Sequence, residues 1–127
     1  MAIHSINHVQ LAFPAGAEGQ IRNFYSALLG LPELPHAATG TALHFAAGAQ
    51  RIELVPTERA RWAAAPAALH LAFEVDNLHA LRGRLLQAEL PLVENRALPG
   101  YLRFYVKDPA GNQLEFLEPD TEQELPV

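Results

Sequence analysis

The sequence contains no cysteine, and this absence excludes disulfide bonds, thiolate metal sites and a cysteine nucleophile. Any bound metal must therefore be held by nitrogen and oxygen atoms. No apolar run approaches the roughly 18–20 residues that a membrane-spanning helix needs. The N-terminus also lacks the basic segment and apolar run of a secretory signal. We therefore expect a soluble cytoplasmic protein that has no membrane partner.

Basic residues are also scarce, with nine lysines and arginines against fourteen acidic residues and a formal net charge of -5. They are scattered along the chain rather than clustered, so we expect no nucleic-acid partner. Half of the 127 residues are hydrophobic and 18% are charged, which is typical of a globular protein. This length suits one domain that buries its own core.

The two halves of the chain share one pattern, in which a strand is followed by a helix. The segments Ile6–Phe13 and Ala68–Val75 both alternate apolar with small or polar residues, as half-buried strands do. Apolar residues at helical spacing then predict helices over about Glu18–Leu29 and Leu78–Ala88. Gly30 is placed to end the first helix. The order of elements therefore repeats along the chain.

Shorter strand-like runs complete each half and are separated by turn residues. Asp76 or Asn77 is expected to cap the second helix, and residues 30–40 are expected to form a loop with one weak strand. An alanine-rich linker or short helical turn, Ala60–Ala68, joins the halves. The segment Asp108–Asn112 has the composition of a turn. The remaining strand-like runs are Thr41–Ala46, Ala49–Val55, Pro91–Glu94, Tyr101–Lys107 and Gln113–Leu117.

One histidine and one glutamate occupy matching places in the two halves. The interval from His8 to His70 is 62 positions, and the interval from Glu53 to Glu115 is also 62. Each histidine therefore lies 45 positions before its glutamate. Chance similarity between apolar strands would rarely preserve both residue types at both intervals, so the match indicates an internal repeat.

The repeated pair is predicted to lie on the polar face of each sheet. Alternate residues of a strand point to opposite faces, and each of the two glutamates lies between apolar residues that helices can cover. The two histidines alternate with apolar residues in the same way. Two such faces brought together would supply two imidazoles and two carboxylates, a ligand set suited to zinc, nickel, iron, manganese or cobalt. We therefore expect a divalent metal held by His8, Glu53, His70 and Glu115.

Other polar residues on the predicted strands are candidates for substrate binding. Residue type alone carries less weight than the repeat, because a single strand histidine is more often structural than a metal ligand. His44 has no counterpart in the repeat, but its place in a strand-like run makes it a candidate. Tyr101, Arg103 and Tyr105 alternate along one predicted strand and therefore share a face. They are either substrate-binding residues of a pocket or part of a polar outer face.

Four segments that together span most of the chain carry a family resemblance, namely His8–Ala12, Phe24–Leu31, Leu69–Asp76 and Phe104–Glu115. They resemble the glyoxalase, bleomycin-resistance and dioxygenase superfamily, also called the vicinal oxygen chelate superfamily. The resemblance implies an α+β fold with a single domain, in which two βαβββ modules at about residues 4–57 and 67–118 form curved mixed sheets around a metal. It also implies a homodimer. The metal positions of glyoxalase I fall on His8, Glu53, His70 and Glu115.

Differences from particular members of the superfamily narrow the expected activity. Where bacterial glyoxalase I has an Arg and an Asn that hold glutathione, this chain has Ala12 and Thr57, so glutathione recognition is not expected. Fosfomycin-resistance transferases have a Thr two residues after the first ligand, where this chain has Gln10.

Ring-cleaving dioxygenases of the extradiol type provide a second comparison. They use two histidines and a glutamate, which His8, His70 and Glu115 match. Their Tyr-x-x-Asp-Pro-x-Gly-x-x-x-Glu run is matched by residues 105–115. The His that they carry upstream of that Tyr is absent from residues 96–103. The resemblance to these enzymes is therefore partial.

The expected function is that of a metal-dependent glyoxalase-like enzyme, of lyase or isomerase type, that acts on a small oxygen-rich molecule by chelating two of its oxygens. Glu53 or Glu115 would move a proton beside the metal. A ring-cleaving dioxygenase is the alternative enzyme. A drug-binding resistance protein is the alternative of a different class, although such proteins typically lack the metal residues. In many members of the superfamily the sites are split across a dimer, and we expect His8 and Glu53 of one chain to meet His70 and Glu115 of the partner subunit.

Overall fold

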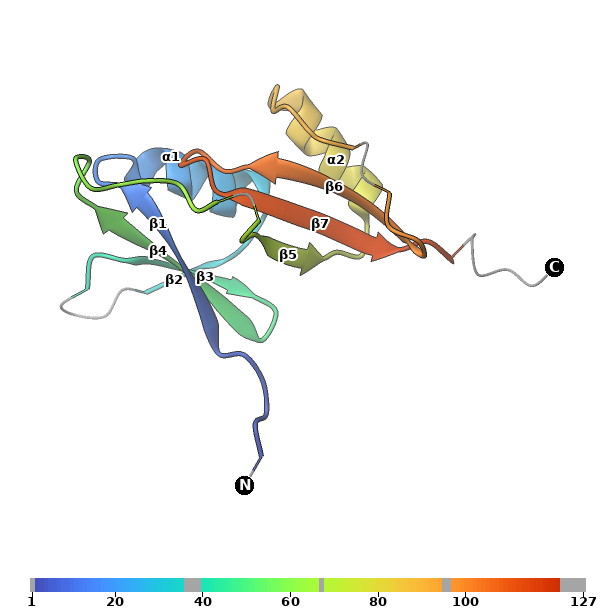
Figure 1. Cartoon of the computed structure of the whole chain (residues 1–127), viewed down its shortest axis with the longest axis horizontal. Helices are drawn as coiled ribbons and strands as arrows, with labels where there is room; N and C mark the ends of the chain where they lie inside the picture. The colour runs from blue at the N-terminus through green and yellow to red at the C-terminus, as the bar shows by residue number, and fades with distance from the viewer. Residues whose placement is uncertain (1, 36–39, 67, 95–96, 122–127) are drawn as a thin grey trace. The chain divides into compact units, whose positions relative to one another are not determined.

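The computed structural model describes residues 2–35, 40–66, 68–94 and 97–121. Contacts within the chain divide it into two compact units, Met1–Ala65 and Pro66–Val127, which are called module one and module two below. Each module contains one mixed β-sheet and helical structure (Figure 1). The α+β class with two βαβββ-type modules is therefore confirmed. No helix in the described ranges has the length and apolar character needed to cross a membrane.

The sheet of module one has the strand order β1-β4-β3-β2. Strand β1 (His8–Pro14) runs parallel to β4 (Gln50–Thr57), and β3 (Leu43–Ala47) is antiparallel to β4. Strand β2 (Glu33–Leu34) pairs with β3 and is the weak strand expected between residues 30 and 40, of which residues 36–39 lie outside the described ranges. The parallel β1–β4 pair requires a crossover, and the helical segment between them supplies it.

The predicted helix at Glu18–Leu29 is α-helical only in its first part, α1 (Glu18–Arg22), and continues as a π-helix, η1 (Asn23–Leu28). The amide of Leu29 bonds to the carbonyl of Phe24 at 3.0 Å, which is the i→i+5 pattern. Consecutive residues of a π-helix are separated by a smaller rotation, so both Phe24 and Tyr25 are buried. The Tyr25 ring stacks on Phe45 of β3 with centroids 5.5 Å apart. The helix expected over about Glu18–Leu29 is therefore confirmed, and its second part is a π-helix in which two adjacent aromatic residues pack inward.

Burial alternates along the strands of module one, as the sequence predicted. The buried side chains lie on one face of the sheet, where helical residues cover them. They include Phe13, Leu43, Phe45, Ile52 and Leu54. The opposite face carries His8, His44 and Glu53, none of which belongs to this core.

The sheet of module two has the strand order β5-β7-β6. Strand β5 (Leu71–Glu74) is parallel to β7 (Gln113–Pro119), and β6 (Tyr101–Lys107) is antiparallel to β7. The strand expected at Pro91–Glu94 is reduced to one bridge, in which Val93 and Tyr105 exchange two backbone hydrogen bonds of 2.9 Å. Pro91 has no amide proton to extend this pairing. The run therefore forms a bridge rather than a full strand.

The helix of module two, α2 (Leu78–Gln87), begins at Asn77, which settles the choice between the two candidate caps. The Asn77 side-chain oxygen accepts a hydrogen bond from the Ala80 amide at 3.1 Å. Three leucines on one side of α2 are buried, and the helix contacts β7. The apolar core of the sheet consists of Phe104, Val106, Leu114 and Phe116. Glu115 lies between two of these residues and therefore points to the other face.

Candidate functional site

The carboxylate of Glu53 lies between two imidazoles on the polar face of module one. Its Oε2 atom is 4.0 Å from Nε2 of His8 at the start of β1. Its Oε1 atom is 3.4 Å from Nδ1 of His44, the residue directly opposite on β3. The side chains of His44 and Glu53 are each 17% exposed, whereas that of His8 is 44% exposed. Glu53 and His44 are therefore largely buried, and the His8 side chain is the exposed member of the three.

The imidazole of His8 is oriented by its neighbours. Its Nδ1 atom lies 2.9 Å from Oδ1 of Asn7, and Arg51 donates to the same Oδ1 atom at 3.1 Å. Because a guanidinium only donates, this atom is the amide oxygen and His8 must donate through Nδ1. The Nε2 atom is the ring nitrogen that faces Glu53. Histidines that ligate metals are commonly held in this way by a second hydrogen bond.

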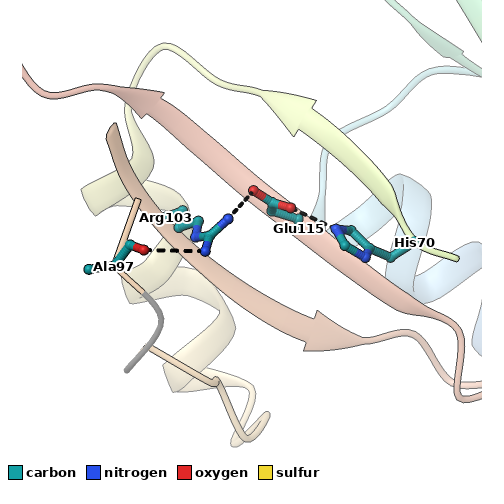
Figure 2. A network of polar contacts seen from close by, with 4 residues as sticks. All are labelled: His70, Ala97, Arg103 and Glu115. Atoms are coloured by element: carbon teal, nitrogen blue, oxygen red, sulfur yellow. Dashed lines mark hydrogen bonds and ion pairs between the residues drawn. The ribbon is translucent and has the colours of Figure 1, made fainter. Parts of the chain in front are cut away.

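The carboxylate of Glu115 lies between an imidazole and a guanidinium in module two (Figure 2). Nε2 of His70 is 2.7 Å from Oε1, and Nη1 of Arg103 donates to Oε2 at 3.3 Å. The Glu115 side chain is only 7% exposed. Since an ionised carboxylate only accepts hydrogen bonds, Nε2 of His70 carries the proton in this pair. Glu115 is therefore engaged through both of its oxygen atoms.

Tyr105 completes the surroundings of Glu115, while Tyr101 lies at the exposed start of β6. Tyr105 is buried and directly opposite Glu115 on the paired strand. Its ring meets the His70 ring edge-on with centroids 5.3 Å apart, and Cζ of Arg103 lies 5.3 Å from its centroid. Tyr101 is 37% exposed and is paired with Pro119. The structure thus brings Arg103 and Tyr105 to the carboxylate.

The parallel strand pairs of the two modules have the same register. Val9 is paired with Ile52 in module one, and Leu71 is paired with Leu114, each residue lying 62 positions further along. This register holds the His–Glu pair in both modules. The hairpins differ, because the residue opposite Glu53 is His44 and the residue opposite Glu115 is Tyr105, an interval of 61 positions.

The sequence did not reveal which residues contact the two His–Glu pairs, each of which is called a half-site below. Sequence reasoning named Arg103 without assigning Glu115 as its partner, and it did not name Asn7 or Arg51. Counting back along the hairpin from Glu115 would have placed Arg103 on the same face as the carboxylate. No pattern in the sequence singles out Asn7.

The donor atoms of each pair, an imidazole nitrogen and a carboxylate oxygen, are of the types that bind divalent metals. Two ligands that each lie roughly 2.0–2.2 Å from one ion are separated by about 3 to 4 Å. The His8–Glu53 distance of 4.0 Å is at the upper end of this range, whereas the His70–Glu115 distance of 2.7 Å is that of a direct hydrogen bond. Across residues 2–35, 40–66, 68–94 and 97–121, no three His, Asp or Glu side chains form a ready metal cluster. Each module therefore contributes a pair of donors, which is half of the expected ligand set.

Comparisons with known proteins agree with this architecture. The sequence model described as the Glyoxalase/Bleomycin resistance protein/Dioxygenase superfamily matches residues 5–116. A crystal structure of a Bacillus anthracis protein assigned to the glyoxalase family is similar with a TM-score of 0.86 and 31% identity. The similarity covers 94% of this chain and 98% of that one. Among curated protein sequences, no significant match was found.

More distant structures share the fold. The antibiotic binding protein TnmS3 from Streptomyces sp. CB03234 matches with a TM-score of 0.73 and 21% identity, over 94% of this chain and 99% of that one. Lactoylglutathione lyase from Agrobacterium tumefaciens matches with a TM-score of 0.72 and 21% identity, over 93% of this chain and 96% of that one. One of these proteins is a binder and the other an enzyme, so likeness of fold alone does not choose between the two functions.

Proposed function

Because this chain belongs to the glyoxalase/bleomycin resistance protein/dioxygenase superfamily, we propose that it is a metal-dependent enzyme acting on a small oxygen-rich molecule. The proposed metal ligands are His8, Glu53, His70 and Glu115. The observation that carries the proposal is the His–Glu pair repeated at the same interval on the same strand register of both modules. The nitrogen and oxygen donors suit zinc, nickel, iron, manganese or cobalt.

The proposed reaction is of lyase or isomerase type, with a carboxylate that moves a proton. A divalent metal in this site would supply a Lewis acid that binds two neighbouring substrate oxygens and polarises a carbonyl. Of the two glutamates, Glu53 is the better placed to move the proton. Its oxygens are 3.4 and 4.0 Å from the nearest imidazole nitrogens. One oxygen of Glu115 is only 2.7 Å from Nε2 of His70 and is therefore more closely engaged than either oxygen of Glu53.

Glutathione conjugates are not the proposed substrates. A glutathione carboxylate is best recognised by a charged donor. Ala12 and Thr57, where bacterial glyoxalase I carries Arg and Asn, supply no such charge. The methylglyoxal–glutathione hemithioacetal should therefore be isomerised far more slowly than by a dedicated glyoxalase. A rate equal to that of a dedicated enzyme would show that this part of the proposal is wrong.

A metal-free binder of small molecules is the second candidate, and one observation favours it. In module two the charge of Glu115 is already balanced by Arg103, and His70 presents a proton to Glu115 rather than a lone pair. The carboxylate of Glu115 already has hydrogen-bond partners and a balancing charge, so it does not require a metal ion. The superfamily similarity to an antibiotic binding protein is compatible with this function.

The proposed active form is a homodimer with split sites. Each module supplies one His–Glu pair, so a site of four ligands requires two modules. We propose that His8 and Glu53 of one chain meet His70 and Glu115 of the partner subunit, as in many members of the superfamily.

Metal analysis separates the two candidates. Protein purified without chelators and then supplied with each candidate ion should retain about one divalent ion per chain, and a His70→Ala variant should lose it. A His79→Ala variant is the matched control, because His79 is an exposed residue of α2 in the same module. Equal metal content in the wild type and the His70→Ala variant, or no metal in either, would favour the metal-free binder.

A further inference from the structure

We propose that Arg103 binds an anionic group of the substrate, and that its ion pair with Glu115 holds the guanidinium in place until a metal engages Glu115. This inference rests on the proposed function and makes it more specific. The substrate would be a 2-oxo or 2-hydroxy acid, which chelates the metal through one carboxylate oxygen and the neighbouring 2-oxygen while the same carboxylate accepts hydrogen bonds from Arg103.

The position of Arg103 supports a role at the site. It lies two residues before Tyr105 on β6 and so shares the face of β6 and β7 that carries Glu115. Its side chain is only 17% exposed. Figure 2 shows the guanidinium between Glu115 and the backbone oxygen of Ala97. A permanent positive charge is thus fixed beside the proposed ligand Glu115.

The contacts of Arg103 in Figure 2 are long for charge-assisted hydrogen bonds. The Nη1 atom is 3.3 Å from Glu115, and Nη2 is 3.5 Å from the Ala97 oxygen, whereas strong pairs of this kind measure roughly 2.7–2.9 Å. The pair Arg22–Glu33 is tighter, with Nε 3.1 Å from both carboxylate oxygens. The Arg103–Glu115 pair is therefore the more readily exchanged for another partner.

When a metal is bound, the positive charge of Arg103 would favour binding of an anion at the site. A guanidinium does not lose its proton in proteins, so Arg103 remains cationic when Glu115 binds a divalent metal. Weakening the ion pair between Glu115 and this largely buried positive charge is unfavourable. A substrate carboxylate would restore the balance, and its two oxygens match the fork of a guanidinium. The Tyr105 ring, 5.3 Å from Cζ, would hold the guanidinium in place during the exchange.

In the described part of module one, no arginine or lysine pairs with Glu53, whose charged or titratable neighbours are the imidazoles of His8 and His44. The residue two positions before His44, in the place that Arg103 takes relative to Tyr105, is Ala42. The anionic end of the substrate is therefore assigned to the module-two half of the site.

The first measurement is the affinity of the protein for the metal alone. Arg103→Gln removes a cation that competes for Glu115, so it should tighten binding of Zn²⁺ or Ni²⁺ by about tenfold. Arg103→Lys keeps the charge and should remain close to wild type. Arg82→Gln is the matched control, because Arg82 pairs with the exposed Glu94 in the same module, and it should change nothing.

The second measurement compares two chelators of matched shape, the dianion oxalate and the neutral oxamide, binding to metal-loaded protein by calorimetry. Arg103→Gln should weaken oxalate by roughly 10- to 100-fold, the range expected for a lost hydrogen bond to a charged group. It should leave oxamide within about twofold. Arg103→Lys should give an intermediate loss for oxalate, and it decides the question if the Gln variant fails to fold.

The outcomes separate this inference from the proposed function. A wild-type protein that binds no metal overturns both. Metal binding in the wild type combined with weaker metal binding in Arg103→Gln overturns only the inference, because Arg103 would then be orienting Glu115 as a ligand. Equal losses for oxalate and oxamide overturn it as well. Tighter metal binding together with a loss confined to oxalate supports it.

Discussion

The two modules carry the same carboxylate in the same strand register and surround it differently. In module one, Glu53 faces the imidazoles of His8 and His44. In module two, Glu115 faces one imidazole, that of His70, and the guanidinium of Arg103. The repeat therefore preserves one His–Glu pair, with the histidine at or just before the start of the first of two parallel strands and the glutamate on the second, and it changes the further residue beside the glutamate. One half-site is left with neutral or titratable neighbours, and the other has a fixed positive charge.

The difference arises from the length of the hairpin loops. In module one, Ala47 is paired with Gln50, which leaves a two-residue loop. In module two, Lys107 is paired with Gln113, which leaves the five-residue loop Asp108–Asn112. The strand register differs as well. The residue opposite the glutamate lies nine positions before Glu53 but ten positions before Glu115, which is a shift of one position relative to the repeat. Arg103, two residues before Tyr105 on β6, is the cation that contacts the carboxylate.

The largest expected effect is on metal content, in heterodimers formed from the His8→Ala and His70→Ala variants. His8→Ala and His70→Ala should each abolish metal binding. When the two variants are unfolded together and refolded as a mixture, half of the dimers should be heterodimers, each with one intact site. Metal content should return to about a quarter of the wild-type value. Heterodimers shown to form without any recovery of metal would rule out sites split across the dimer.

The hairpin loops should differ in their contribution to stability. Asp108 is buried, and its Oδ1 atom accepts the amides of Ala110 and Asn112 at 2.9 Å each, while Oδ2 accepts Nδ2 of Asn112 at 3.1 Å. Asp108→Ala removes these three hydrogen bonds from a buried turn, which should lower the free energy of unfolding by about 3 kcal/mol.

The matched change in module one is Gly48→Ala. Gly48 has φ +60°, and no atom lies within 4 Å of the position that a Cβ would take, so only backbone strain opposes a side chain there. The expected cost is about 1 kcal/mol. Urea unfolding of both variants measures the difference. Equal losses would mean that the Asp108 hydrogen bonds contribute little beyond the turn itself.

Much of this comparison could be predicted from the sequence, because it depends on short periodic patterns. The opening and closing strands, the polar faces and a helix cap at Asp76 or Asn77 follow from residue type and alternation, and the structure selects Asn77. The His–Glu repeat follows from counting. The π-helix at Asn23–Leu28 does not, since it depends on packing Phe24 and Tyr25 together against the sheet. The pairing of Arg103 with Glu115 also depends on a hairpin register that the loop length sets.

Replacing His44 in module one and Arg103 in module two should change metal affinity in opposite directions. His44 lies 3.4 Å from Oε1 of Glu53 and is placed to orient that carboxylate. His44→Ala should therefore weaken metal binding by about tenfold, the lower end of the effect of losing a residue that supports a ligand. Arg103→Gln should strengthen it, because it removes the cation that competes for Glu115. Competition with a chelator gives both affinities, and changes of the same sign would mean that the two carboxylates have equivalent surroundings.

The smallest expected effect concerns an ion pair that each module forms between its helical segment and the segment that follows. Arg22 pairs with Glu33 in module one, and Arg82 pairs with Glu94 in module two. The hydrogen bond from Arg82 is the main cause that lowers the pKa of Glu94; burial opposes it to a lesser extent, and the charge of Arg82 lowers the pKa further. A carboxyl group whose pKa is lower in the folded state stabilises the protein above its unfolded pKa of about 4.3. That stabilisation is lost as the pH falls through the folded pKa.

Glu94→Gln should consequently lower the Tm slightly at pH 7, and this difference from wild type should vanish well below pH 4. The change is expected to be small because both side chains are substantially exposed, at 39% and 42%. Thermal melts of the two proteins at pH 7 and pH 3 measure it, and comparing them at each pH cancels the protonation of the carboxylates they share. Glu33→Gln is the matched change in module one. A Glu94→Gln difference that persisted at pH 3 would mean that the side chain acts through packing against α2 rather than through its charge.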